Sequence, residues 1–156
     1  MKRILIFFVL MIAAVLLPTP FFERSDVSEL KPAQLLWIGE VEGRIFVATE
    51  EGDTGEGTEL SSAFDDLKAT TSGRIFLDTV EYVLISRQAI ELLPKLSGIL
   101  RPGCGICLNA GETDLESAAE YLDSHKPQLT LAEYCAEPQD LPMLISEGGK
   151  FHLVQP

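Results

Sequence analysis

Basic residues are scarce in this sequence of 156 residues. It has 12 lysines and arginines against 24 aspartates and glutamates, for a formal net charge of −12. Lys2 and Arg3 precede the first acid, Glu23, so the rest of the chain carries 10 basic and 24 acidic side chains, a net charge of −14. A field of this sign repels nucleic acid and anionic lipid headgroups. It excludes nucleic acid as a partner and favours simple solubility, or a basic partner or cation.

The sequence also lacks the motifs of common enzyme classes. There is no G-x-S-x-G nucleophile motif, and the Gly55-Glu-Gly57 segment lacks the lysine and serine or threonine of a P-loop. Only two histidines are present, and neither lies in a motif. Acidic pairs such as Asp65-Asp66 are expected on a solvated helix face. No catalytic residue, metal site or cofactor is therefore predicted. A hydrolase built on scattered acids is a weaker hypothesis.

Three cysteines are present, and two of them form the sharpest motif, Cys104-Gly-Ile-Cys107. A C-x-x-C can be a redox-active dithiol, half of a zinc site or a structural pair. A thioredoxin-type centre has its first cysteine at a helix N-terminus, where the thiol pKa falls. Here strand-like sequence follows instead, and Cys135, His125 and His152 stand at no zinc-ligand spacing. Structural cysteines are favoured, and Cys104 and Cys107 remain the candidate disulfide or redox pair.

The first 22 residues have the layout of a secretory targeting segment. Lys2 and Arg3 precede an unbroken apolar run from Ile4 to Leu17, and polar sequence begins at Glu23. The run is short for a bilayer span of about 20 residues, but it approaches that length when counted on through Phe22. No A-x-A cleavage site follows it. We expect a cleaved signal peptide or a retained signal anchor, and the anchor is slightly favoured.

The charge at the start of this segment fixes the expected location of the rest. The positive end of an apolar segment stays on the cytoplasmic side. The remainder is then extracytoplasmic, either on the cell membrane as a single-pass protein or secreted. Membrane contact through the N-terminal segment and binding to a membrane-protein partner are the expected interactions.

Residues 35–156 are predicted to form a single domain after a linker at residues 23–34. Apolar stretches separated by turn residues predict a hairpin at 35–42 and 44–49, a strand from 74 to 85 bent at Asp78-Thr79, a strand at 105–109, and a closing hairpin at 143–146 and 151–154. Residues 50–57 are expected to be a flexible acidic loop.

Helical spacing of apolar residues predicts three helices. The first is capped by Thr58 and runs to about residue 69, and the second spans 87–98 with Ser86 as N-cap and a kink at Pro94. The third follows a capping box of Thr113 and Glu116. Residues 129–135 are ambiguous between strand and helix. This order of elements predicts an α+β fold, a mixed sheet with about three helices packed on it, after an N-terminal hydrophobic helix.

The segment from Gly55 to Ile85, GEGTELSSAFDDLKATTSGRIFLDTVEYVLI, resembles the N-terminal domain of the germinant-receptor C-subunit family of endospore-forming bacteria. The resembling features are the Gly55-Glu-Gly57 turn into a helix, the strand Arg74-Ile-Phe76 and the apolar strand at 80–85. Family members carry a lipidated cysteine and further domains, whereas this chain has no lipobox cysteine and would be a stand-alone relative of one domain. The resemblance implies a fold and a link to sporulation or germination, but no functional residue.

Two functions of different classes follow from the sequence. The first is a non-enzymatic, extracytoplasmic, membrane-proximal interaction module. The alternative is an extracytoplasmic thiol-disulfide protein that uses Cys104 and Cys107.

Overall fold

The computed structural model of the chain describes residues 30–156, so the predicted targeting segment, with its hydrophobic helix, and residues 23–29 of the predicted linker lie outside the described residues. The strands are β1 (Leu30–Pro32), β2 (Leu35–Val41), β3 (Arg44–Thr49), β4 (Thr54–Gly57), β5 (Arg74–Phe76), β6 (Tyr82–Ile85), β7 (Gly105–Ala110), β8 (Met143–Glu147) and β9 (Lys150–Val154). The helices are α2 (Leu60–Thr70), α3 (Leu93–Leu96), α4 (Leu115–Ser124) and α5 (Leu131–Ala136), with 3-10 turns η2 (Leu77–Thr79) and η3 (Arg87–Leu92). Within this part of the chain no helix has both the length and the apolarity to cross a membrane.

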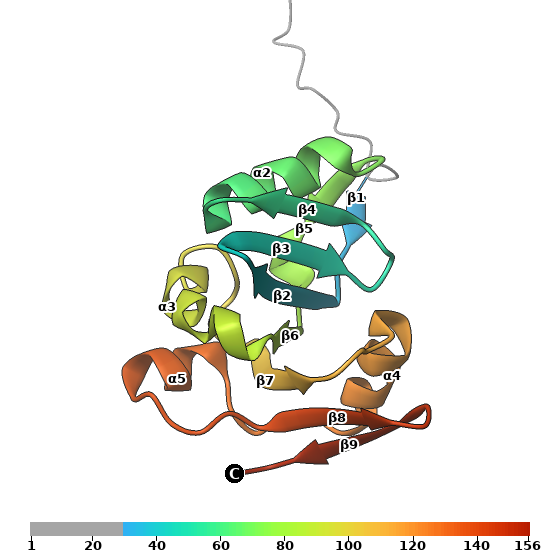
Figure 1. Ribbon diagram of the computed structural model, residues 1–156, viewed down its shortest axis with the longest axis vertical. Helices are drawn as coiled ribbons and strands as arrows, with labels where there is room; N and C mark the ends of the chain where they lie inside the picture. Colours follow the sequence, from blue (N-terminus) through green and yellow to red (C-terminus); the bar gives the residue numbers. More distant parts are fainter. Residues whose placement is uncertain (1–29) are drawn as a thin grey trace, which may run out of the picture.

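One mixed sheet organises the described chain (Figure 1). Its seven strands lie in the order β4-β3-β2-β6-β7-β8-β9. The four central strands β2, β6, β7 and β8 are parallel, and an antiparallel hairpin partner flanks them on each side. Strands β1 and β5 pair in parallel as a separate two-stranded sheet. The prediction of an α+β fold with a mixed sheet is confirmed, with four α-helices among the described residues.

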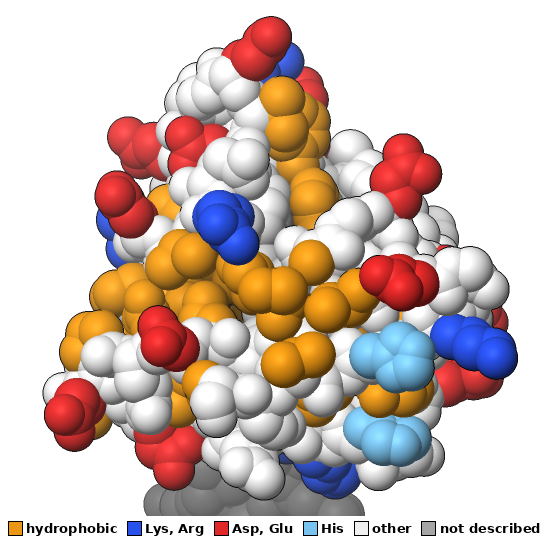
Figure 2. Space-filling view, turned by 60° about the horizontal axis from the view of Figure 1, so that its bottom comes forward, with side chains coloured by type: hydrophobic (Ala, Val, Ile, Leu, Met, Phe, Trp, Pro, Cys, Tyr) orange, Lys and Arg blue, Asp and Glu red, His pale blue; other side chains and the backbone are white. Residues whose placement is uncertain are grey.

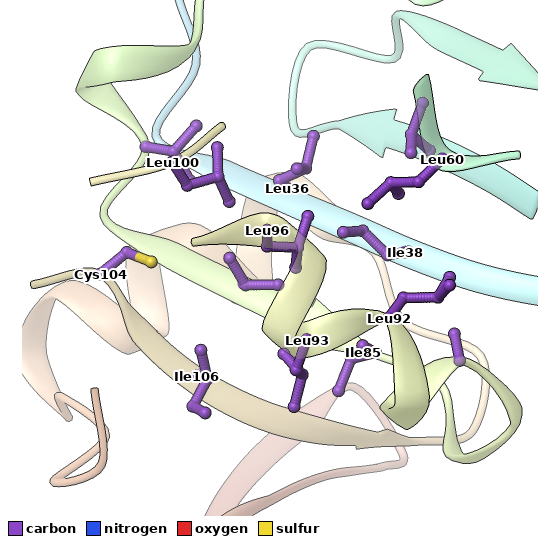
Figure 3. Close-up of a cluster of buried hydrophobic side chains, with 14 of the residues drawn as sticks. Leu36, Ile38, Leu60, Ile85, Leu92, Leu93, Leu96, Leu100, Cys104 and Ile106 are labelled. Atoms are coloured by element: carbon purple, nitrogen blue, oxygen red, sulfur yellow. The ribbon is translucent and has the colours of Figure 1, made fainter. Parts of the chain in front are cut away.

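The two faces of the sheet bury separate hydrophobic clusters. On the first face α2, η3, α3 and α5 cover Leu36, Ile38, Ile85 and Ile106, which pack against Leu93 and Leu96 (Figure 3). On the second face the buried side chains come from the sheet and from α4. They are Leu35, Tyr82, Leu84, Cys107, Ala118, Ala119, Leu122 and Leu144. Figure 1 shows α3 and α5 at the left of the sheet and α4 at the right.

Most of the strongly patterned elements are confirmed. Both hairpins form where they are predicted. The helix predicted to follow a cap at Thr58 is α2, which buries its apolar face but is capped by Glu59 instead. Pro94 lies in the first turn of α3, and the 3-10 turn η3 ends just before this helix. The predicted break in the helix at Pro94 is therefore confirmed. The ambiguous segment 129–135 resolves as α5, with a capping box between Thr130 and Glu133.

Two predicted irregular segments are partly wrong. Residues 54–57 of the predicted acidic loop form the edge strand β4, which pairs with β3. Residues 30–32 of the predicted linker form β1, where Pro32 is compatible with an edge strand because its missing N–H is not needed there. Both segments are ordered by tertiary pairing that local composition does not show.

Two further details differ from the prediction. The single bent strand over 74–85 is in fact two strands in different sheets, β5 and β6, joined by the turn η2 that contains Asp78. The predicted capping box of Thr113 and Glu116 is also wrong. Helix α4 is capped by Asp114, whose carboxylate accepts the Ser117 N–H, because Thr113 instead donates to the Asn109 side chain.

Candidate interaction surface

Cys104 and Cys107, the candidate redox pair, lie in different hydrophobic clusters. Cys104 is buried in the cluster of the first face, and Cys107 is buried under α4 on the second face. Residues three apart in an extended strand point to opposite faces of a sheet. All three cysteines are free thiols, and Cys135 is exposed on α5. This arrangement does not favour a disulfide between Cys104 and Cys107.

The chemistry of the two buried thiols agrees with their packing. Burial raises the pKa of Cys104 to about 11, although the nearby Arg101 acts in the opposite direction. Burial alone raises the pKa of Cys107 to about 12. Because the thiolate is the nucleophile in redox exchange, a raised pKa makes these thiols unreactive near neutral pH. They behave as small apolar side chains of the core.

Acidic and histidine side chains do not gather into a metal site in the described part of the chain, where no group of three or more potential ligands occurs. His125 stacks on the Tyr121 ring at a centroid distance of 4.2 Å.

In the acidic segment before β4, Glu50 accepts hydrogen bonds from the N–H groups of Gln34 and Leu35. Its carboxylate therefore joins the start of β2 to the end of β3.

The Gly55-Glu-Gly57 segment has a packing role. A Cβ atom at Gly55 would lie 2.3 Å from the Leu67 amide nitrogen, and one at Gly57 would lie 2.6 Å from the Ala63 amide nitrogen. Both values are too short for any real contact, so only glycine lets α2 rest directly on β4. The motif that carries the family resemblance is explained by helix-on-strand packing rather than by anion binding.

At both edges of the main sheet, helix side chains form hydrogen bonds with backbone groups that point away from the neighbouring strand. At β4 the Glu56 N–H donates to the Asp66 carboxylate (2.9 Å), and the Thr54 carbonyl accepts from the Thr70 hydroxyl (2.8 Å). At β9 the Leu153 N–H donates to the Tyr121 hydroxyl (3.2 Å). Occupied edges protect a sheet from pairing with foreign strands. Partner binding by strand addition is therefore disfavoured at these positions.

The first face of β8 and β9 remains partly open. Met143 and Ile145 on β8 and Val154 on β9 share this face with the buried Leu108, as the strand register requires. Met143 and Ile145 are only partly buried, and Val154 is 51% exposed. We call these three residues the apolar strip. Figure 2, turned so that the β9 side comes forward, shows hydrophobic side chains gathered into a broad band on this side of the molecule.

A polar hollow of about 330 Å³ lies at the end of β9 and includes acidic groups. Glu133 of α5 and Asp140 line it together with Gln155, the neighbour of Val154. Hydrogen bonds from the Thr130 amide and hydroxyl lower the pKa of Glu133, so its carboxylate stays ionised. The strip and the hollow together offer apolar contact beside negative charge, which suits a partner with apolar and basic side chains.

Sequence reasoning missed this surface. The pattern of β8 and β9 predicts a hairpin, but alternation alone does not tell which of its two faces a helix covers. The short α5, followed by Pro138 and Pro142, leaves the first face of β8 and β9 partly exposed. Comparisons with protein-family models, with curated proteins and with solved structures found no match to this chain.

Proposed function

We propose that this chain is an extracytoplasmic, membrane-proximal interaction module that is held at the membrane by its N-terminal apolar segment and binds a membrane-protein partner. The observation that carries the proposal is the apolar strip of Met143, Ile145 and Val154. A partly exposed row of apolar side chains on a sheet face marks a contact surface more often than a group of isolated apolar residues does.

Two other features support binding through this face. Side chains of α2 and α4 already occupy backbone groups at the sheet edges, so a partner would pack on side chains rather than extend the sheet. The acidic hollow beside Val154 adds charge that can orient a basic partner. A link to sporulation or germination is part of the proposal and rests on the resemblance of residues 55–85.

Site-specific photo-cross-linking in native membranes tests this proposal. A photoreactive amino acid placed at Val154 of the full chain should give one discrete cross-linked product of higher mass. The same amino acid at Ser61, an exposed position on α2, is the matched control and should not give that product. Uncross-linked monomer from position 154, or identical products from both positions, would contradict the proposal.

A further inference from the structure

The domain begins at the end that lies opposite its C-terminus. Strand β1 is at one end of the molecule, and β9 with the C-terminus is at the other (Figure 1). The parallel pairing of β1 with β5 places Leu30 beside Arg74 and Pro32 beside Phe76. The chain therefore enters the fold next to β5.

Strand β5 exposes an aromatic side chain at this end. Phe76 is 41% exposed, and it lines a surface hollow of about 480 Å³ together with Arg74 and Lys68 of α2. Arg74 forms no ion pair with any side chain of the described region, and Lys68 pairs loosely with Asp65 at 3.9 Å. An exposed aromatic ring beside a free guanidinium group is a combination that favours the interface of a phospholipid bilayer.

The length of chain before β1 sets how far this end can move from a membrane. Seven residues, 23–29, separate the end of the apolar segment at Phe22 from Leu30. Fully extended, such a linker spans at most about 25 Å. If the apolar segment is the anchor, β5 stays within this distance of the bilayer. Tethering over so short a distance gives an effective concentration in the millimolar range, at which a weak surface contact is occupied.

The charges around Phe76 decide what kind of membrane this surface fits. Asp78 also lines the hollow, and Asp65 lies beside Lys68, so the two cations and two acids nearly cancel. A patch without net charge is attracted only weakly to anionic lipid. Burial of the Phe76 ring must therefore supply most of the free energy of binding. The contact should form on zwitterionic phosphatidylcholine.

We propose that Phe76 and Arg74 form a second, membrane-contacting surface that lays the β5 end of the domain on the phospholipid interface and keeps the apolar strip, at the β9 end, away from it. This inference rests on the membrane anchoring included in the proposed function. Its test must therefore report anchoring and surface contact separately.

Fluorescence quenching by lipid on the full chain in phosphatidylcholine vesicles provides that test. Trp37 is the single tryptophan, so Trp37→Phe gives a background without indole. Phe76→Trp in this background should be quenched at least about twofold more strongly by brominated phosphatidylcholine than Val154→Trp, the matched control at the opposite end. Equal quenching of the two variants would overturn the inference.

Flotation of the same vesicles reports anchoring independently. A chain that does not float with the vesicles contradicts the proposed anchoring, whereas a chain that floats without selective quenching contradicts only the β5 surface. Hydrogen exchange of the unmodified chain covers the case in which Trp37→Phe does not fold. Residues 73–78 should exchange more slowly in vesicles than in detergent, relative to residues 143–154, and unchanged exchange would also overturn the inference.

Discussion

Gly55 of β4 lies so close to Leu67 of α2 that a Cβ atom at position 55 would stand 2.3 Å from the Leu67 amide nitrogen. The obstructing atoms belong to helix backbone and cannot move aside like the end of a flexible side chain. The contact brings α2 close enough for Asp66 and Thr70 to reach the edge of β4. One missing side chain thus enables both the packing of the helix and the protection of the edge.

Gly55→Ala should destabilise the protein by about 1–3 kcal/mol, because the added methyl group forces α2 away from the sheet. Urea unfolding followed by circular dichroism measures the change in free energy. Gly103→Ala is the matched control, since Gly103 has no atom within 4 Å of an added Cβ and no positive φ. A Gly55→Ala variant as stable as the Gly103→Ala variant would contradict the packing role.

The same glycines explain why β4 escaped prediction from the sequence. Glycine, aspartate and glutamate before a helix are typical of a loop, and nothing local indicates that Gly55 and Gly57 face a helix backbone. The hairpin of β2 and β3 was predictable because two apolar stretches on either side of a turn at Gly43 indicate paired strands from the local sequence alone. The apolar strip was not predictable, because its exposure depends on how much of β8 and β9 the short helix α5 covers in the tertiary structure.

Alkylation should distinguish the three cysteines. With iodoacetamide at pH 8, Cys135 should react first, and Cys104 and Cys107 should stay protected because both are buried with pKa values of about 11 and 12. Mass spectrometry of peptides from the folded chain gives the three rates. All three should react in urea, which serves as the control. Equal rates for Cys104 and Cys135 in the folded chain would show that Cys104 is accessible.

Insulin reduction tests the alternative function directly. The unmodified chain should reduce insulin no faster than the double variant Cys104→Ser, Cys107→Ser, because the two thiols face opposite sides of the sheet. A turbidity assay with dithiothreitol measures the rate. Cys135→Ser is the control for non-specific thiol reactivity. Loss of an insulin-reducing activity in the double variant alone would support a thiol-disulfide protein after all.

Because its thiols are buried, the protein should become less stable as the pH rises into the alkaline range. Burial raises the pKa of Cys107 from 9.0 to about 12 in the folded state. The contribution of this thiol to the free energy of unfolding is therefore complete below pH 9 and is lost as the pH rises toward 12. The destabilisation caused by Cys107→Ala should therefore shrink between pH 9 and 11, by on the order of 1 kcal/mol per pH unit. Urea unfolding at each pH measures it. Cys135→Ala, at an exposed thiol, is the control variant, and a constant difference for Cys107→Ala would contradict the assignment.

Removal of the Tyr121 hydroxyl should open the β9 edge without disturbing the core. Tyr121→Phe leaves the Leu153 N–H without its acceptor, which costs about 1 kcal/mol, and water or a foreign strand can then reach this group. The Leu153 amide should exchange faster in hydrogen-exchange measurements, and the variant should associate more at high concentration. Tyr134→Phe is the matched control, since the Tyr134 hydroxyl makes no hydrogen bond within residues 30–156.

The outcome also separates two ways in which this end of the domain could bind a partner. If Tyr121→Phe leaves cross-linking from Val154 unchanged, the partner packs on the apolar strip, and the β9 edge is only protected against unwanted pairing. If the variant instead binds its partner more tightly, strand addition at β9 contributes, and Tyr121 acts as a barrier to it. The apolar strip predicts the first result, because Val154 and Ile145 present side chains on the sheet face whereas the Leu153 N–H points out of the sheet edge.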